Sequence, residues 1–258
     1  MTDIPYTEQT KRFNFTWIAE VIFHPARAFR RIATQTASTW LTPLIILSIV
    51  VLINVLVVGG LKNKAAQMGE ITYPPDFQYY TPEQQAQYMQ ATQSTKGPVF
   101  IYVLPAIASL LGVWFGWLIL GGIVHLVTTL SGGRGSTMLS MNIVAWASLP
   151  LAVREIIQII YMLITKKMIN SPGLSGFSAP DATGINLFFS LLLGLIDIYL
   201  IWQILLIILG VRISTKLSTA KSTFSTLLSV LIILLLQTGL SYLVSALSDL
   251  TITRPFFF

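Results

Sequence analysis

Residues 132–164, GGRGSTMLSMNIVAWASLPLAVREIIQIIYMLI, decide how the rest of the chain is interpreted. They begin as a glycine-rich turn and continue as an apolar run long enough to cross a bilayer. Pro150 interrupts the middle of this run, and Arg154 and Glu155 place two charges there. A proline removes a helical hydrogen bond, and a charge in hydrocarbon costs about 2.5–3.5 kcal/mol or more. The segment therefore predicts a membrane-spanning helix whose polar residues have a structural or functional role.

The composition of the whole chain is that of a membrane protein. Of its 258 residues, 54% are hydrophobic and 10% are charged, and the mean hydropathy is +0.73. Soluble domains average about 25% charged residues. The net charge of +6 lies mostly beside apolar segments, which indicates membrane topology and anionic headgroups rather than nucleic acid. The absence of cysteine excludes thiolate catalysis and cysteine-based metal sites, and with two histidines we expect no metal ion and no cofactor.

The predicted fold class is all-α, a polytopic bundle with five transmembrane helices. Residues 1–12 form a polar tail, residues 13–39 an amphipathic interfacial element, residues 40–247 the five-span domain, and residues 248–258 a C-terminal tail. The loop at 61–98 contains a capping box, Thr81-Pro82-Glu83-Gln84, which predicts a short helix over about 82–94. The apolar runs predict spans at about 40–60, 99–130, 141–165, 185–211 and 224–247.

The distribution of Lys and Arg predicts the orientation. With a cytoplasmic N-terminus, nine Lys and Arg residues lie in the inner segments and six in the outer segments. This bias favours a multi-pass protein of the cell membrane with its N-terminus in the cytoplasm and its C-terminus outside. The first fifteen residues lack the pattern of a cleavable signal peptide, so we expect the first span to direct insertion.

The segment before the first span is amphipathic. Its apolar residues recur every three or four positions, while Arg27, Arg30 and Arg31 fall largely off that stripe. Pro25 is expected to divide the segment into two short helices. Two interpretations remain open: an element lying in the membrane interface with its basic residues at the surface, or a helix pair packed on the cytoplasmic end of the bundle.

The second span carries a face of small residues. Ser109, Gly112 and Gly116 share one side of the predicted helix, and residues 112–116 form a GxxxG motif. Small residues let helix backbones approach closely, so this face predicts helix packing, within the bundle more than between copies. His125 lies near the end of the same span and is expected to be a hydrogen-bonded packing residue, with a proton relay as the alternative.

Two intramembrane charges are predicted to meet. Arg154 lies 13 residues from Met141, and Asp197 lies 14 residues from Val211 at the same side of the membrane. At about 1.5 Å per residue both lie about 20 Å deep, so their depths agree. Glu155 points about 100° away from Arg154 around the helix, so we expect it not to pair with Arg154 but to face another polar group or to carry a proton. A structural pair is favoured over a conducting path.

These motifs resemble the Yip membrane-protein family. The resemblance covers FHPARAFRRI at residues 23–32, GGRGS at 132–136, AWASLP at 145–150, and IWQIL at 201–205 through to STAK at 218–221. It implies a non-enzymatic, five-span helical protein. Eukaryotic relatives are linked to Rab GTPases and carry an Asp-Leu-Tyr-Gly-Pro motif, for which this chain has only WLTP at residues 40–43. The short N-terminus is more similar to the prokaryotic branch, some of whose members accompany ABC-type exporters.

Three functions are compatible with this sequence. The first is an accessory, assembly or regulatory subunit of a larger membrane complex, whose partners would be the lipid bilayer and another membrane protein, such as ABC transporter subunits, or a second copy. The second is a small transporter with Arg154, Glu155, Asp197 and His125 along a polar path. The third, an intramembrane enzyme, is disfavoured because no G-x-S-x-G or HExxH motif occurs and no catalytic residues can be named.

Overall fold

The computed structural model describes residues 13–35, 37–67, 77–95, 97–179 and 182–253. Within these ranges the chain is almost entirely helical and contains no strand. Five helical segments are long and apolar enough to cross a membrane: Leu41–Ala65, Val99–Leu130, Thr137–Thr165, Ile198–Thr215 and Thr219–Ala246. The predicted all-α fold with five spans is confirmed, and the protein is a multi-pass membrane protein.

The first two spans are single long helices. Helix α3 (Leu41–Gln67) continues beyond the predicted end at residue 60. The second span consists of a π-helical turn, η2 (Val99–Val103), and helix α5 (Leu104–Leu130). Between these two spans the predicted capping box is present at the start of α4 (Pro82–Thr95), where the Thr81 amide donates to Gln84 Oε1 at 3.0 Å and the Gln84 amide to Thr81 Oγ1 at 3.3 Å.

The third span is divided at Ser148 into α6 (Thr137–Ala147) and α7 (Leu149–Thr165). Pro150 lacks an amide hydrogen and sits in the first turn of α7, where that hydrogen would have no helical acceptor. The Ser148 hydroxyl donates to the Val144 carbonyl at 2.8 Å and so satisfies a carbonyl at the break. The interruption therefore leaves the Val144 carbonyl with a hydrogen-bond donor inside the membrane.

The prediction of one continuous helix over residues 185–211 is wrong. These residues belong to two helices, α8 (Gly184–Leu195) and α9 (Ile198–Thr215), which are separated by two residues with extended backbone, and of the two only α9 is long enough to cross a membrane. Asp197 has φ −147° and ψ −179°, and its Oδ1 accepts from the Leu200 amide at 2.8 Å. The break was not predicted, because the residues on both sides of Asp197 are mostly apolar. Asp197 itself acts as the N-cap of the new helix.

The last helix is longer than predicted. Helix α10 (Thr219–Thr253) begins five residues before the expected start at residue 224 and continues past residue 247. Residues 248–253, which we expected in a tail, therefore belong to this helix. The predicted polar tail at residues 1–12 and the last five residues of the chain lie outside the described residues.

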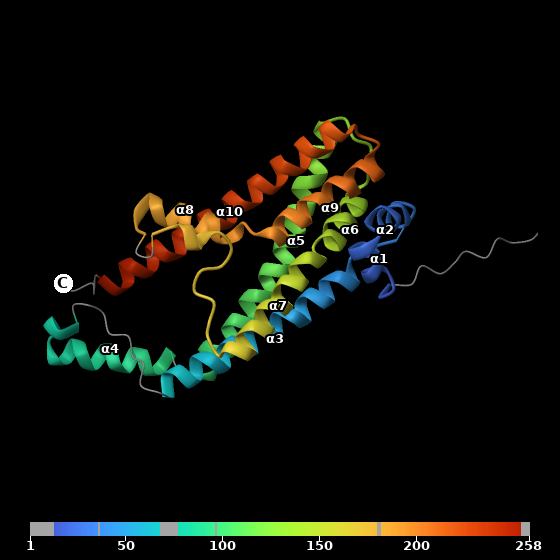
Figure 1. The fold of residues 1–258 in the computed structure, drawn as a ribbon. Helices are drawn as coiled ribbons and strands as arrows, with labels where there is room; N and C mark the ends of the chain where they lie inside the picture. Colours follow the sequence, from blue (N-terminus) through green and yellow to red (C-terminus); the bar gives the residue numbers. More distant parts are fainter. Residues whose placement is uncertain (1–12, 36, 68–76, 96, 180–181, 254–258) are drawn as a thin grey trace, which may run out of the picture.

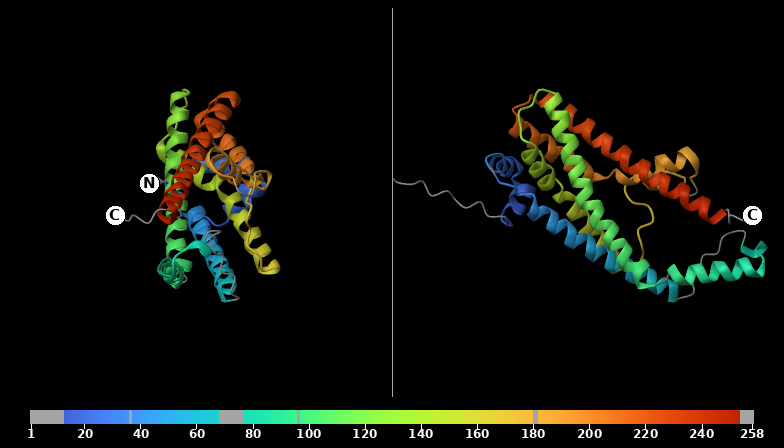
Figure 2. Two further views of the ribbon diagram at one scale, coloured as in Figure 1. Left: turned by 90° about the vertical axis from the view of Figure 1, so that its left-hand side faces the viewer. Right: turned by 180° about the vertical axis from the view of Figure 1, so that it is seen from behind.

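The helices converge at one end of the molecule and diverge at the other. Figure 1 shows α1 and α2 together with the α5–α6 and α9–α10 connections at one end, which we call the N-terminal end. From there α3, α5 and α7 run along one arm, while α10, accompanied by α8, runs along a second arm. The view from behind in Figure 2 shows α5 and α10 meeting at the N-terminal end and separating toward the opposite end, which we call the far end.

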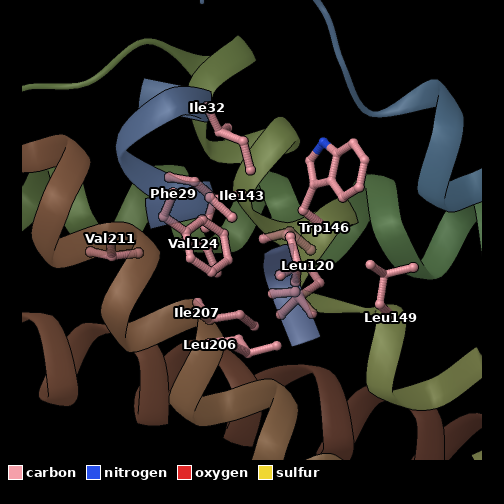
Figure 3. Close-up of a cluster of buried hydrophobic side chains, with 14 of the residues drawn as sticks. Phe29, Ile32, Leu120, Val124, Ile143, Trp146, Leu149, Leu206, Ile207 and Val211 are labelled. Atoms are coloured by element: carbon pink, nitrogen blue, oxygen red, sulfur yellow. The ribbon is translucent and has the colours of Figure 1, made fainter. Parts of the chain in front are cut away.

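The amphipathic segment packs on the bundle. It forms α1 (Trp17–Phe23) and α2 (Pro25–Ala33), which meet at Pro25 as predicted. Phe29 and Ile32 of the apolar stripe are at most 1% exposed and belong to the core cluster formed with α6 and α9 (Figure 3). Of the two open interpretations, the structure therefore agrees with the packed helix pair for α2. Its apolar stripe faces protein and does not face lipid.

The core of the N-terminal end is built around Trp146. This side chain is fully buried, its ring lies 5.6 Å from that of Trp17 at an interplanar angle of 42°, and its Nε1 donates to Thr39 Oγ1 at 3.1 Å. Residues 142–150 are all buried, so α6 is the centre of this cluster (Figure 3). Helix α9 approaches it at Gly210, where a Cβ atom would lie 2.5 Å from Ile143 Cγ2 and 3.1 Å from the Phe29 ring.

The glycine-rich turn between α5 and α6 requires its glycines. Gly132 has φ +90°, a backbone conformation that residues with a side chain rarely adopt. A Cβ atom on Gly133 would lie 2.9 Å from the Thr128 carbonyl oxygen. The Lys221 ammonium donates to the Ser131 carbonyl at 3.2 Å and links the turn to α10. The turn is therefore a tight structural connection.

Candidate functional site

The charged residues of the third and fourth spans form one cluster between α7 and α9. Arg154 Nη1 lies 3.3 Å from Asp197 Oδ2, and Arg154 Nη2 lies 3.0 Å from Glu155 Oε1. The prediction that Arg154 and Asp197 meet is confirmed. The Arg154 side chain is 27% exposed and each carboxylate side chain is 16% exposed, so the cluster is largely but not completely enclosed.

The expectation that Glu155 would not pair with Arg154 is wrong. The 100° offset separates the two positions around α7, but both side chains are long enough to curl back over the helix surface toward each other. Glu155 Oε2 also accepts a hydrogen bond from Asn54 Nδ2 of α3. Glu155 therefore connects α3 to the Arg154–Asp197 pair, and three spans meet at this cluster.

Asp197 has two roles in this cluster. One oxygen accepts from the Leu200 amide as the N-cap of α9, and the other accepts from Arg154. An N-cap carboxylate is stabilised by the positive end of the helix dipole as well as by the hydrogen bond. The break in the fourth span and the ion pair thus depend on the same side chain, which places the start of α9 against the middle of α7.

A cleft of about 500 Å³ lies between the two arms, beside this cluster. Its walls are mostly apolar side chains of α3, α5 and α10, and Arg154 and Glu155 lie on its surface. Further polar side chains line it: Ser109, Ser148, Gln203, Gln237 and Ser241. Gln203 is 5% exposed and donates to Ser148 Oγ at 3.0 Å, which joins α9 to the break in the third span.

The small-residue face of α5 lines this cleft. Ser109, Gly112 and Gly116 are all on its surface. A Cβ atom on Gly112 would meet nothing within 4 Å, and one on Gly116 would come no closer than 3.9 Å, to Gln237 Nε2. Gly112 therefore faces open space, whereas Gly116 lies at van der Waals distance from Gln237 of α10. The arms diverge at this level, so neither position requires a glycine for a close approach of two backbones.

A comparison with known families identifies the fold. Residues 19–241 match the family model of the Yip1 domain. The protein belongs to the Yip1 domain family. The matched region begins in α1 and ends within α10, so it contains the bent third span, the ion cluster and the whole cleft. No match was found among curated proteins or among solved structures.

The other predicted site residues of this Yip1 domain lie outside the cleft. His125 is half-buried on α5, and its Nδ1 lies 3.5 Å from Ser140 Oγ of α6, a long contact between neighbouring helices. Pro150 is buried at the start of α7. Arg27, Arg30 and Arg31 are exposed on α2, and Arg31 Nη1 contacts both Glu20 carboxylate oxygens at 3.1 Å.

Sequence reasoning missed three polar members of the Yip1-domain site: Asn54, Gln203 and Gln237. Each is an amide side chain within an otherwise apolar span. Amides in hydrocarbon seek hydrogen-bonding partners across helices, and this rule could have singled them out. The rule does not identify the partners, because that requires the rotation of each helix. Within the described residues, no group of three or more His, Asp or Glu side chains could hold a metal ion.

Proposed function

We propose that this Yip1-domain protein is a non-enzymatic accessory, assembly or regulatory subunit of a larger membrane complex. The observation that carries the proposal is the exposure of α5. Only 6% of the most apolar part of the second span is buried within the chain, compared with 56% for the third span. The outer face of α5 in this part of the span is therefore available to a helix of another protein.

The chemistry of α5 suits such a partner. Leu111 and Phe115 are 50% and 55% exposed and lie on the same side of the helix, one turn apart. In a membrane, lipid is as apolar as these side chains, so association depends on van der Waals packing rather than on the hydrophobic effect. An aromatic and a branched side chain one turn apart provide an uneven surface into which another helix can pack.

The partner that we propose is a membrane protein of the ABC-exporter type. Support comes from the similarity of this chain to the prokaryotic branch of the family, some of whose members accompany such exporters. A second copy of the chain is the alternative partner, and the experiment below separates the two. Because no catalytic motif occurs in the sequence, we propose a role in assembly or regulation rather than in chemistry.

We also propose that α2 orients the N-terminal end against the membrane surface. Arg27 and Arg30 are exposed, and no ion pair is formed by either within the described residues. Phe15 and Phe23 are 58% and 74% exposed nearby in the chain. Basic and aromatic side chains together favour the headgroup region of an anionic leaflet.

Affinity purification in mild detergent tests the accessory role. We expect a stoichiometric membrane-protein partner, identified by mass spectrometry, and we expect Phe115→Ala to reduce its recovery several-fold. Phe189→Ala on α8 is the matched control, because Phe189 is 53% exposed on the other arm. The proposal fails if the protein purifies without any partner, or if both variants recover the partner equally. Recovery of a second, differently tagged copy alone would identify self-association instead.

A second candidate function is transport, and the polar cleft is the observation that favours it. Charged side chains within a span commonly mark a path for ions or polar substrates. Reconstitution into liposomes tests it, since a purified transporter moves substrate without other proteins. Flux that requires Glu155 would support this candidate, and a protein that folds but moves none of the solutes tested would favour the accessory role.

A further inference from the structure

The cleft between the arms combines an apolar enclosure with a charged floor. Its volume of about 500 Å³ falls in the range of small-molecule sites, about 300–1,000 Å³. Leu47, Val113 and Leu234 are among its apolar walls, and the Trp117 ring forms part of its lining. Trp117 is held in place by a hydrogen bond from Nε1 to the Met141 carbonyl at 3.0 Å.

The charges of the cluster beside the cleft do not balance, although only Arg154 and Glu155 line the cleft itself. Arg154 contributes +1, and Glu155 and Asp197, which lies behind Arg154, contribute −1 each, so the three side chains sum to −1 when all are ionised. Asn54 adds a hydrogen bond but no charge. An uncompensated charge is costly to keep away from water, so the floor favours an additional positive charge.

The geometry restricts what that positive charge can be. All four carboxylate oxygens already accept a hydrogen bond, from Arg154 twice, from the Leu200 amide and from Asn54. A divalent metal ion needs several oxygen ligands in direct contact, and no group of three or more His, Asp or Glu side chains in the described part of the chain could supply them. A cation whose charge is shielded by carbon groups needs only the electrostatic field and an apolar surface. An aromatic ring such as that of Trp117 also attracts such a cation.

We propose that the cleft binds a hydrophobic organic cation, with the positive charge against Glu155 and the carbon groups against α5 and α10. The lack of side chains at Gly112 and Gly116 keeps the α5 wall open for the apolar part of the ligand. This site goes beyond the proposed accessory role and does not require it. It assigns a ligand class to the cleft whether or not a partner protein is present.

Binding of tetraphenylphosphonium to the purified protein in nanodiscs tests this proposal. Tetraphenylborate is the matched control, because it has nearly the same size and shape with the opposite charge. Empty nanodiscs measure partition of each probe into lipid. We expect saturable binding of the cation at one site per chain and no saturable binding of the anion. Equal binding of both probes would show an apolar crevice without charge selection and would overturn the proposal.

Glu155→Gln tests the charge assignment. The substitution keeps an acceptor for Asn54 and changes the summed charge of the Arg154, Glu155 and Asp197 cluster from −1 to 0. We expect the cation to bind about tenfold more weakly, because a unit charge facing the cleft is lost. Circular dichroism and the elution volume establish that the variant is folded. A folded Glu155→Gln variant with unchanged affinity would overturn the assignment of Glu155.

Gly112→Leu tests the location without altering any charge. A Cβ atom at Gly112 meets nothing within 4 Å, so the new side chain enters the cleft without displacing a helix. Gly122→Leu is the control, since Gly122 is equally open and lies on the same helix outside the cleft lining. We expect only Gly112→Leu to reduce cation binding, and an equal effect of both variants would place the site elsewhere. Since these measurements use the purified chain, failure here leaves the partner experiment unaffected.

Discussion

The N-terminal end and the far end of this bundle are held together by different kinds of contact. At the N-terminal end, α2, α6 and α9 interlock through large buried side chains and a glycine that admits them, with Trp146, Phe29 and Gly210 at the centre. Toward the far end the arms diverge (Figures 1 and 2). There the ion cluster of Arg154, Glu155 and Asp197 joins α7 to the start of α9. Glycines occur in both regions, but only Gly210, at the N-terminal end, is in close contact with side chains of other helices.

This difference shows that glycine has opposite roles in the two regions: it admits close packing at the N-terminal end and leaves open space toward the far end. Gly210 is needed because two side chains occupy the space beside it, whereas Gly112 leaves space empty. Protein interiors are close-packed, so the first kind of site tolerates no added atom, and the second accepts one. The packed end supplies stability, and the open end supplies a cavity. The four predictions below test this division, from the largest expected effect to the smallest.

The largest effect is expected from Trp146→Ala. The substitution leaves a large cavity in the packed end and removes the hydrogen bond to Thr39, so we expect a loss of about 3–5 kcal/mol in the free energy of unfolding. Thermal unfolding followed by circular dichroism in detergent measures it. Phe115→Ala, at a side chain that is 55% exposed on α5, is the control and is expected to change stability little. Similar losses for both would contradict the division into two regions.

The next effect concerns the ion cluster. Arg154→Gln leaves both carboxylates without a cation, so we expect a loss of about 3 kcal/mol in the free energy of unfolding. Asp197→Asn keeps a side chain that caps α9 equally well, and Arg154 keeps its contact with Glu155, so we expect a smaller loss of about 1 kcal/mol. The double variant is expected to recover part of the loss. Strictly additive losses would mean that the pair does not couple the two arms.

Substitutions at Gly210 and Gly112 are expected to change the free energy of unfolding by smaller amounts and in opposite directions. Gly210→Ala forces a Cβ atom against Ile143 and Phe29 and should cost about 1–3 kcal/mol. Gly112→Ala meets no atom and should be neutral or add about 0.5–1 kcal/mol, because alanine favours helix over glycine. The melting temperatures of the two variants, each compared with that of the unmodified protein, test both expectations. Destabilisation by Gly112→Ala would mean that another helix packs against α5 at Gly112, contrary to the structure.

The smallest perturbation tests which end faces the cytoplasm. The chain has no cysteine, so single cysteines can be introduced without background. Ser171 and Ser218 are both exposed, in the α7–α8 and α9–α10 connections. We expect Ser171→Cys to react with an impermeant maleimide in intact cells, and Ser218→Cys to react only after permeabilisation. The reverse pattern would mean that the Lys and Arg bias was interpreted with the wrong sign.

The candidate site was only partly predictable. Matched depths along two helices brought Arg154 and Asp197 together, because the rise of a helix depends on residue number alone. Glu155 was assigned away from Arg154 on the basis of helix rotation, but a long side chain can bridge that angle. Asn54 was not considered, since its partner lies 101 positions away in the chain and only the packing of α3 on α7 reveals it.

The sequence by itself determined the number of spans, the division of the amphipathic segment at Pro25 and the capping box before α4. These depend on rules that act locally: a bilayer requires each crossing segment to satisfy its own backbone, proline lacks a donor, and a cap bonds within one turn. Tertiary structure decided which surface each apolar or small residue faces. Lipid and protein interior are equally apolar, so hydrophobicity cannot distinguish them. The stripe of α2 was therefore assigned to lipid as readily as to protein, and the glycines of α5 were assigned to a contact when they line a cleft.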